Sequence, residues 1–139
     1  MAVQVGQRLQ SFLTEKMPAV LSTTRLDGSV QSVPVWYEFA DGGTILINGG
    51  PTRDWLRHMQ RDNGRVTLLF VDPQNMFRWA QVQGRLVNVV KDPGGEHINH
   101  LSHRYFGREY PGPRTDRLKM EIEPVRVTGG ENREPWDVT

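Results

Sequence analysis

Apolar and polar residues alternate along much of the chain, in short runs that Gly, Asp, Asn and Pro separate. Alternation with a period of two predicts strands with one buried face. The pattern predicts strands at residues 19–24, 30–39, 44–48, 65–71, 76–90 and 118–128. Turn sequences rich in Asp and Gly link the first three strands, as is typical of hairpins. The chain is therefore predicted to be mainly β.

Three of these strands contain a residue that disturbs a regular ladder. Pro34 cannot donate a backbone hydrogen bond, so its strand is expected to be bulged or at an edge there. Gly84 predicts a bulge or a sharp bend in the fifth strand. Pro124 is expected to interrupt the last strand.

Helical spacing appears in three segments, 5–16, 52–62 and 92–106. Thr52 is expected to cap the second helix, and Asp92-Pro93 has the form of an N-cap followed by Pro at the first helical position. Gly107 is expected to end the third helix. Six strands with two or three peripheral helices predict a small antiparallel barrel. Side chains would fill its interior, so a ligand is expected outside it or between subunits.

Composition narrows the class of protein. The chain has 139 residues, 17 Lys and Arg against 16 Asp and Glu, and no Cys. These values predict one domain over residues 1–128, with a polar, loosely held tail at 129–139. Without Cys there is no disulfide and no Cys-ligated metal site. The net charge of +1 argues against a protein that binds nucleic acid mainly through its overall charge. No signal peptide or membrane span is evident, so a cytoplasmic protein is expected.

The segment that follows the predicted strand 44–48 carries the clearest candidate chemistry. Arg53, Arg57 and Arg61 recur every four residues and share one helix face, while Trp55, Leu56 and Met59 point toward a core. A phosphate at the helix N-terminus would offset the repulsion, because backbone N–H groups, the helix dipole and arginines all favour an anion there. The alternative is a solvated helix face that nearby aspartates balance.

Aromatic residues form a second candidate group. Trp36 and Tyr37 on one strand, with Phe77 and Trp79 on another, can flank a planar ring. Ordinary packing in the core and at a dimer interface is the alternative. The series His97, His100 and His103 resembles a metal motif, but its steps of three spread the side chains around a helix, so no metal site is expected. No hydrolase or nucleotide-triphosphatase motif is present.

The order of these motifs resembles the pyridoxamine-phosphate-oxidase-like split barrels. The order comprises a strand with an Asp-Gly turn, V-x-S-V-P-V-W-Y-x-F, a strand ending in Asn-Gly-Gly, and R-x-x-x-R-x-x-x-R-D-N. Within that superfamily the chain is most similar to the flavin/deazaflavin oxidoreductases that use coenzyme F420 (group B), over residues 17–128. The resemblance implies a six-stranded, Greek-key split β-barrel that forms a homodimer, with the cofactor in a groove at the subunit interface.

The resemblance also implies site residues. It places Arg53 and Arg57 on the cofactor phosphate, with Trp55 where the family usually has Lys and His58 where Asn is frequent. Around the tricyclic ring and the ribityl chain it places Ser32, Val33, Pro34, Val35, Trp36, Asn48 and Gly49, together with Phe77 of the partner subunit and Trp79 of the partner subunit. The loop 105–113 is implied to shape the substrate entrance.

The implied reaction is hydride transfer between reduced F420 and a conjugated or electron-poor small molecule. The cofactor carries that chemistry and the protein binds and orients it. Tyr37, His58, Tyr110 and solvent are the candidate proton donors. FMN in the same fold is the main alternative cofactor, and a protein that binds a flavin or deazaflavin without turnover is a further alternative. Quinones, enones and bilin-like tetrapyrroles remain open as substrates.

Overall fold

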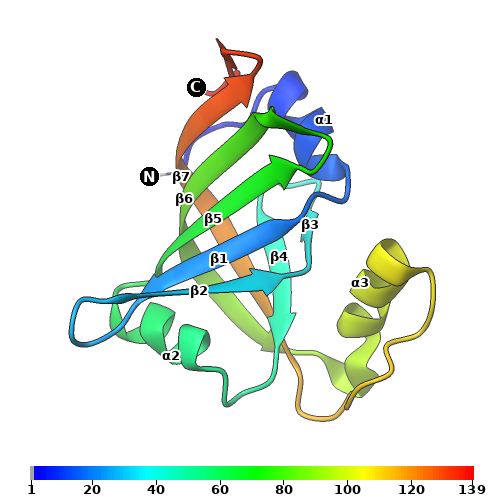
Figure 1. The fold of residues 1–139 in the computed structure, drawn as a ribbon. Helices are drawn as coiled ribbons and strands as arrows, with labels where there is room; N and C mark the ends of the chain where they lie inside the picture. Colours follow the sequence, from blue (N-terminus) through cyan, green and yellow to red (C-terminus); the bar gives the residue numbers. More distant parts are fainter. Residues whose placement is uncertain (1) are drawn as a thin grey trace.

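The computed structural model describes residues 2–139 of the chain, and residue 1 lies outside the described part. The chain forms one antiparallel sheet with three α-helices around it (Figure 1). In chain order the elements are α1 (Gln7–Thr14), β1 (Ala19–Thr24), β2 (Val30–Val35), β3 (Tyr37–Phe39), β4 (Ile45–Gly49), α2 (Asp54–Arg61), β5 (Arg65–Asp72), β6 (Asn75–Lys91), η1 (Pro93–Gly95), α3 (Glu96–Phe106), β7 (Leu118–Glu131) and β8 (Glu134–Pro135).

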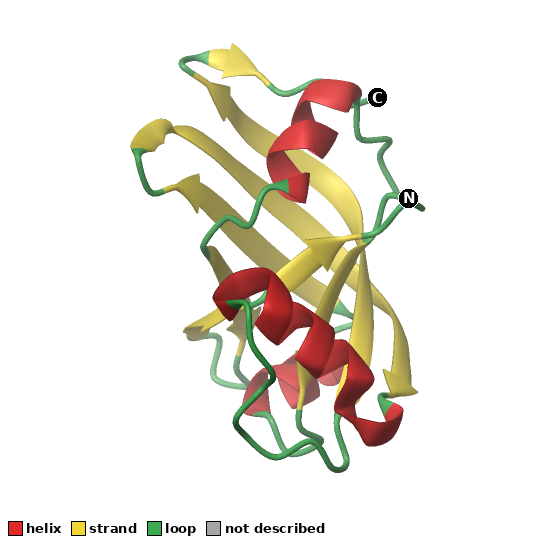
Figure 2. Ribbon diagram, turned by 90° about the vertical axis from the view of Figure 1, so that its right-hand side faces the viewer, coloured by secondary structure: helices red, strands yellow, loops and turns green. Residues whose placement is uncertain are grey.

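The strand order explains why the sheet curls. Neighbouring strands follow the order β2-β1-β5-β6-β7-β4-β3, and β8 pairs with β7. The strands at the two ends of this order, β2 and β3, are consecutive in the chain and only Trp36 separates them. Because one residue joins the two edges, the sheet has to close on itself (Figures 1 and 2). The structure therefore confirms the predicted mainly β, antiparallel split barrel.

The predicted strand 30–39 is two strands, and this raises the number of strands above six. The break falls at Trp36 rather than at Pro34. Pro34 lies within β2 and pairs with Val20 of β1. Since β2 ends the strand order, the missing N–H of proline costs no ladder bond on its free side, and the predicted edge position is confirmed.

The last predicted strand is longer than expected and continuous. β7 continues through Pro124 as one strand, so the expected interruption takes the form of an irregularity in its pairing with β6. Pro124 lies opposite Gly84, where the register of β6 against β7 shifts. A bulge leaves a position without a ladder hydrogen bond, which is where a proline is tolerated in a sheet. The predicted irregularity at Gly84 is confirmed by the same register shift.

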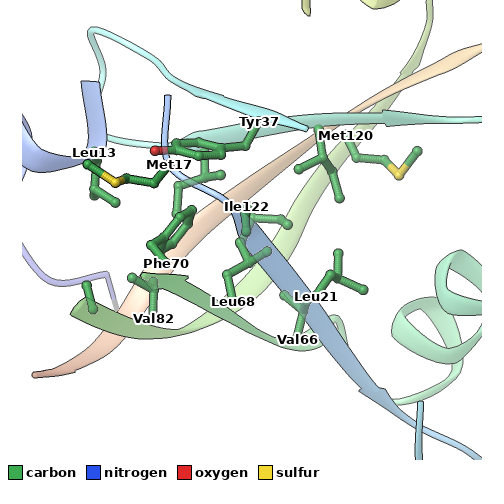
Figure 3. Close-up of a cluster of buried hydrophobic side chains, with 14 of the residues drawn as sticks. Leu13, Met17, Leu21, Tyr37, Val66, Leu68, Phe70, Val82, Met120 and Ile122 are labelled. Atoms are coloured by element: carbon green, nitrogen blue, oxygen red, sulfur yellow. The ribbon is translucent and has the colours of Figure 1, made fainter. Parts of the chain in front are cut away.

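Apolar side chains fill the interior of the curled sheet (Figure 3). Leu21, Phe70, Val82 and Ile122 are completely buried there. Tyr37 is also completely buried, and its hydroxyl donates to the carbonyl oxygen of Glu15 at 2.8 Å. Side chains therefore fill the interior, as predicted for a small barrel.

The tail at residues 129–139 is part of the fold, so the expectation of a loosely held tail is wrong. β7 runs to Glu131, and β8 turns back against it. Trp136 is buried, with its ring centroid 4.9 Å from that of Phe12 in α1. The carboxylate of Asp137 accepts hydrogen bonds from the backbone N–H groups of Arg8 and Leu9, both at 3.0 Å. Polar tail residues are thus used to hold the N-terminal helix.

The helix boundaries depend on side chains outside the local sequence. α2 begins at Asp54, and Arg53 is its N-cap residue. The predicted cap at Thr52 is therefore wrong. Asp92 caps α3 from a distance, because η1 intervenes and the carboxylate then accepts from the N–H groups of His97 and Ile98 at 2.8 and 3.1 Å. Gly107 ends α3 in the left-handed conformation, as predicted.

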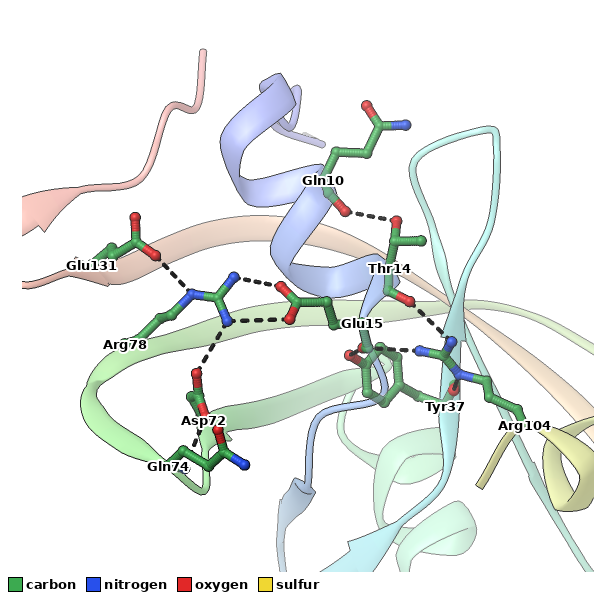
Figure 4. A network of polar contacts seen from close by, with 9 residues as sticks. All are labelled: Gln10, Thr14, Glu15, Tyr37, Asp72, Gln74, Arg78, Arg104 and Glu131. Carbon is green, nitrogen blue, oxygen red and sulfur yellow. Dashed lines mark hydrogen bonds and ion pairs between the residues drawn. The ribbon is translucent and has the colours of Figure 1, made fainter. Parts of the chain in front are cut away.

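Two arginines join α1 to the rest of the fold (Figure 4). Arg78 in β6 contacts the carboxylates of Glu15, Asp72 and Glu131. The hydrogen bond to Glu15 is the main cause that raises the pKa of the Arg78 guanidinium, and the bonds to Asp72 and Glu131 add to it. Arg104 in α3 donates to three backbone carbonyl oxygens, those of Thr14, Glu15 and Tyr37. The end of α1 is therefore tied to both the β5–β6 hairpin and α3.

No helix within residues 2–139 is both long enough and apolar enough to span a membrane.

Candidate functional site

The arginine face of α2 forms as the spacing predicts. Arg53, Arg57 and Arg61 are exposed, whereas Trp55, Leu56 and Met59 are buried. Arg57 forms an ion pair with Asp54 one turn earlier. Within residues 2–139, no carboxylate lies within 4.0 Å of the guanidinium nitrogens of Arg53. Arg53 is thus available to an external anion at the start of the helix.

The loop before α2 is shaped by close packing of Trp55. A side chain at Gly49 would place its Cβ 2.8 Å from two ring carbons of Trp55, so the backbone can approach the ring only because this residue is glycine. At Gly50 a Cβ would meet nothing within 4 Å. Trp55 therefore packs against the loop from the buried side of α2 and is not on the exposed arginine face. The space next to Gly50 is open.

The outer face of β2, β1, β5 and β6 is a large surface without a covering helix. In Figure 1 no helix lies in front of these strands. Because Leu21, Leu68 and Val82 point inward, the alternate residues point outward. The outward residues include Val20, Ser22, Ser32, Pro34, Thr67, Leu69, Val71, Trp79, Gln81 and Gln83. None of these ten residues is charged, whereas Arg65 and Arg85, which pair at the end of β5 next to α2, are exposed.

Of the five residues that the resemblance places around a ring, two lie on this outer face. Ser32 and Pro34 point outward, and the Ser32 hydroxyl is 2.8 Å from that of Ser22. Val33 and Val35 pack against the core instead. Trp36 is the residue between β2 and β3, and it belongs to a separate aromatic group.

That aromatic group lies where β2 meets β3 and α3. The ring of Trp36 stacks on Tyr105, with centroids 5.7 Å apart and an interplanar angle of 10°. Phe106 and Tyr110 meet the same indole edge-on, at 5.1 and 6.0 Å. The guanidinium of Arg117 lies 5.2 Å from the centroid of Tyr110. The loop after α3 is therefore held against Trp36.

Phe77 and Trp79 do not meet Arg53 within one chain. Phe77, 66% exposed, lies at the β5–β6 turn, whereas α2 leads into the other end of β5 at Arg65. Figure 1 shows the turn and the helix at opposite ends of the sheet. Trp79 faces outward from β6, and its carbonyl oxygen accepts from the Trp136 indole N–H at 2.7 Å.

The three candidate proton donors differ in accessibility. Tyr37 is completely buried, and burial raises the pKa of its phenol. His58 lies on the buried side of α2, with its Nδ1 2.8 Å from the Thr23 hydroxyl oxygen. Tyr110 is half-buried beside Arg117. Among these three, only Tyr110 retains a solvent-facing side chain.

The histidines of α3 meet a carboxylate that the sequence analysis did not single out. His97 Nε2 lies 3.3 Å and His100 Nε2 lies 2.6 Å from the two carboxylate oxygens of Glu38 in β3. Hydrogen bonding from His97 is the main cause that lowers the pKa of Glu38. His103 is exposed. The described residues contain no group of three or more His, Asp, Glu or Cys side chains placed to hold a metal ion.

Asn48 lies at the centre of a further set of polar contacts. Its Nδ2 is 3.0 Å from both Asp92 Oδ2 and His97 Nδ1, and its Oδ1 accepts from Arg117 Nε at 2.9 Å. Asn48 was a predicted site residue, whereas the contacts that Asp92, His97 and Arg117 make with it were not predicted. No local pattern marks this group, because its four residues come from four separate segments of the chain.

Solved structures with the same architecture include one named F420 reductase. It is 28% identical in sequence, with a TM-score of 0.79, and the match covers 89% of this chain and 98% of that chain. A conserved hypothetical protein from Mycobacterium tuberculosis is 20% identical, with a TM-score of 0.74 over 95% of this chain and 88% of that chain. An FAD-binding protein from Mesorhizobium loti is also 20% identical, with a TM-score of 0.59 over 91% of this chain and 96% of that chain. No curated protein matches the sequence.

The sequence model of pyridoxamine 5'-phosphate oxidase matches residues 5–129, which comprise nearly all of the barrel and its helices. The chain therefore belongs to the pyridoxamine 5'-phosphate oxidase family.

Proposed function

We propose that the protein is an F420-dependent oxidoreductase that transfers a hydride between reduced F420 and a conjugated or electron-poor small molecule. The observation that carries the proposal is the exposed Arg53 at the start of α2, beside the open Gly50 loop. The similarity to a structure named F420 reductase supports the choice of cofactor.

The residues present fit the phosphate of such a cofactor. Arg53 has no carboxylate partner among residues 2–139, and Arg57 has one guanidinium nitrogen on Asp54, which leaves its other donors for an anion. The first N–H groups of α2 point out of the helix start and favour negative charge. In this proposal Arg53 and Arg57 bind the phosphate, and Gly49 and Gly50 allow the backbone to come close to it.

The ring of the cofactor would lie on the outer sheet face near Ser32 and Pro34. When bound, F420 supplies the hydride chemistry, and the protein orients it and excludes water from one side. No acid or base on the chain is required for hydride transfer itself. Tyr110 or solvent would donate a proton to an anionic product.

A homodimer completes this site in the proposal. Phe77 and Arg53 lie at opposite ends of the sheet in one chain, so Phe77 can approach the cofactor only as Phe77 of the partner subunit. The outer face of β1, β2, β5 and β6 is the surface on which a second copy would pack. The same packing would cover the exposed apolar side chains of that face.

Fluorescence titration with oxidised F420 and, separately, with FMN tests the cofactor. We expect saturable binding of F420, and we expect Arg53→Ala to weaken it by about 1–3 kcal/mol, as for a lost hydrogen bond between charged groups. Arg53→Lys is the matched control, because it keeps the positive charge and loses the planar fork of donors, so its loss of affinity should be smaller. Unchanged affinity in Arg53→Ala would show that the phosphate assignment is wrong.

Arg61 separates the two cofactor candidates. It is exposed at the end of α2, on the same side as Arg53, and no carboxylate of residues 2–139 lies within 4.0 Å of its guanidinium. F420 carries an acidic tail beyond its phosphate that FMN lacks. If Arg61 belongs to a basic track for that tail, Arg61→Ala weakens binding of F420 and not of FMN. Preferential binding of FMN by the unmodified protein would favour the flavin alternative.

A further inference from the structure

Five polar side chains from separate segments, with Asn48 at the centre, form one connected set of contacts. Glu38 comes from β3, Asn48 from the end of β4, Asp92 precedes η1, His97 lies in the first turn of α3, and Arg117 precedes β7. Asp92, His97 and Arg117 each lie within hydrogen-bond distance of the Asn48 amide, at 2.9 to 3.0 Å. Glu38 contacts the far side of the His97 ring.

The neighbours of Asn48 fix which way its amide points. The Arg117 guanidinium can only donate, so the atom facing it must be the amide oxygen. An ionised Asp92 can only accept, so the atom facing it must be the amide nitrogen. Hydrogen bonds from the His97 and Ile98 N–H groups favour that ionised form and help to hold the pKa of Asp92 below its ordinary value, although its burial acts in the opposite direction. If the amide were flipped, its nitrogen would face the donor of Arg117 and its oxygen would face the acceptor of Asp92.

The orientation of Asn48 in turn fixes the tautomer of His97. The amide nitrogen that faces Asp92 also faces His97 Nδ1, so Nδ1 must accept a hydrogen bond and carries no proton. The proton of a neutral imidazole is then on Nε2, where it is donated to Glu38.

We propose that His97, as this Nε2–H tautomer, is a positioning residue for the loop at residues 48–53; its effect on cofactor affinity rests on the proposed function. Asn48 is the last side chain before the glycines that lead to Arg53. The contacts on Asn48 connect this loop to α3 through His97 and to the aromatic group through Arg117 and Tyr110. The cofactor loop and the proposed substrate entrance thus share one rigid support.

The contacts of Asn48 fit only an imidazole without a proton on Nδ1. A second proton on His97 would go to Nδ1 and oppose the Asn48 N–H group, while Arg117 and Asp92 resist a flip of the amide. The charged groups that contact His97 are Glu38 from β3 and Asp92 from the segment before η1, whereas Arg117 from the segment before β7 contacts Asn48. His100, one turn along α3, shares Glu38 with it.

Nuclear magnetic resonance of the imidazole nitrogens tests the tautomer without any cofactor. At neutral pH we expect the ¹⁵N signals of His97 to show a protonated Nε2 and an unprotonated Nδ1. An Nδ1–H tautomer, or averaging between the two tautomers, would overturn the assignment. His103, which is exposed on the same helix, is the internal reference for an averaged imidazole.

Titration of the protein and its variants with F420 tests the positioning role. We expect His97→Ala to bind F420 roughly 3- to 10-fold more weakly at pH 7.5, as for a lost neutral hydrogen bond. His97→Gln keeps one acceptor and one donor and cannot take up a proton, so it is expected to restore the affinity. His103→Gln is the matched control and should behave as the unmodified protein does.

Rescue by His97→Gln distinguishes positioning from a merely structural role. If the side-chain hydrogen bonds of residue 97 position the loop, His97→Gln should regain the affinity that His97→Ala loses. Equal affinities in His97→Gln and His97→Ala, or unchanged affinity in His97→Ala, would overturn the positioning role. Failure of the unmodified protein to bind F420 would overturn the proposed function instead. In that case amide hydrogen exchange at Gly50, faster in His97→Ala than in His103→Gln if the proposal holds, decides the positioning role.

Discussion

Gly84 shows how one residue sets the curvature of the sheet. It lies where the register between β6 and β7 shifts, and a Cβ there would be 2.5 Å from Ile122 Cγ2 and 3.0 Å from the carbonyl oxygen of Glu123. Gly84→Ala would force the two strands apart at the bend. We expect a loss of about 1–3 kcal/mol in the free energy of unfolding, as for other overpacked positions, measured by urea denaturation.

Gly42 provides the matched control for this substitution. It lies in the turn before β4, and a Cβ there would meet nothing within 4 Å. Gly42→Ala is therefore expected to change the free energy of unfolding by less than about 0.5 kcal/mol. Equal losses at the two positions would show that the contact with Ile122 does not limit the bend.

At the scale of an element, α1 depends on a residue from the other end of the chain. Gly6, its N-cap residue, has no side chain to offer, and the carboxylate of Asp137 accepts from the N–H groups of Arg8 and Leu9 instead. A Cβ on Gly6 would overlap Asp137, so glycine is needed for this approach. The helix start and the tail are therefore expected to unfold together.

The pH dependence of stability tests this cap. Burial alone would raise the pKa of Asp137, but the hydrogen bonds from Arg8 and Leu9 outweigh it and lower that pKa below the ordinary value of 3.8. A lowered pKa stabilises the fold at pH values above 3.8, and that contribution is lost as the pH falls through the pKa of the folded state. We expect Asp137→Asn to cost about 1 kcal/mol at pH 7, as for a lost helix cap.

The difference between Asp137→Asn and the unmodified protein should shrink as the pH is lowered from about 4 toward 2, where the native carboxyl also becomes protonated. Thermal unfolding followed by circular dichroism at a series of pH values measures it. A difference that stays constant into strong acid would contradict a role for the charged carboxylate.

At the scale of the whole molecule, the uncovered outer sheet face predicts self-association. Val20, 36% exposed, lies on this face between the outward residues of β2 and β5. We expect the protein to sediment as a dimer and Val20→Arg to shift it toward monomer, because an arginine there would be buried without a partner. Sedimentation velocity over a range of concentrations makes the measurement.

Leu26→Arg is the control for the dimer prediction. Leu26 is 82% exposed in the turn between β1 and β2, outside the strands that form the outer face. The variant should remain dimeric. A protein that stays monomeric without any substitution would remove the dimer, and with it the approach of Phe77 of the partner subunit to the cofactor.

The sequence by itself determined the features that depend on neighbouring residues. Alternation of apolar residues identified most strands to within a few positions, and spacing by four identified the exposed arginines of α2 and the buried side of Trp55. Gly84 and Gly107 were assigned correctly because a bend and a helix end require a particular backbone conformation at that residue. These properties follow from backbone periodicity and local sterics.

Only the tertiary structure decided which distant residues meet. Asp137 caps α1 across 128 and 129 positions of sequence, and Glu38 meets His97 across 59. The break at Trp36 follows from closure of the sheet rather than from the strand's own pattern, which pointed to Pro34. The tautomer of His97 depends on Arg117 and Asp92 through Asn48. Such contacts are set by strand register and sheet curvature, which no local pattern encodes.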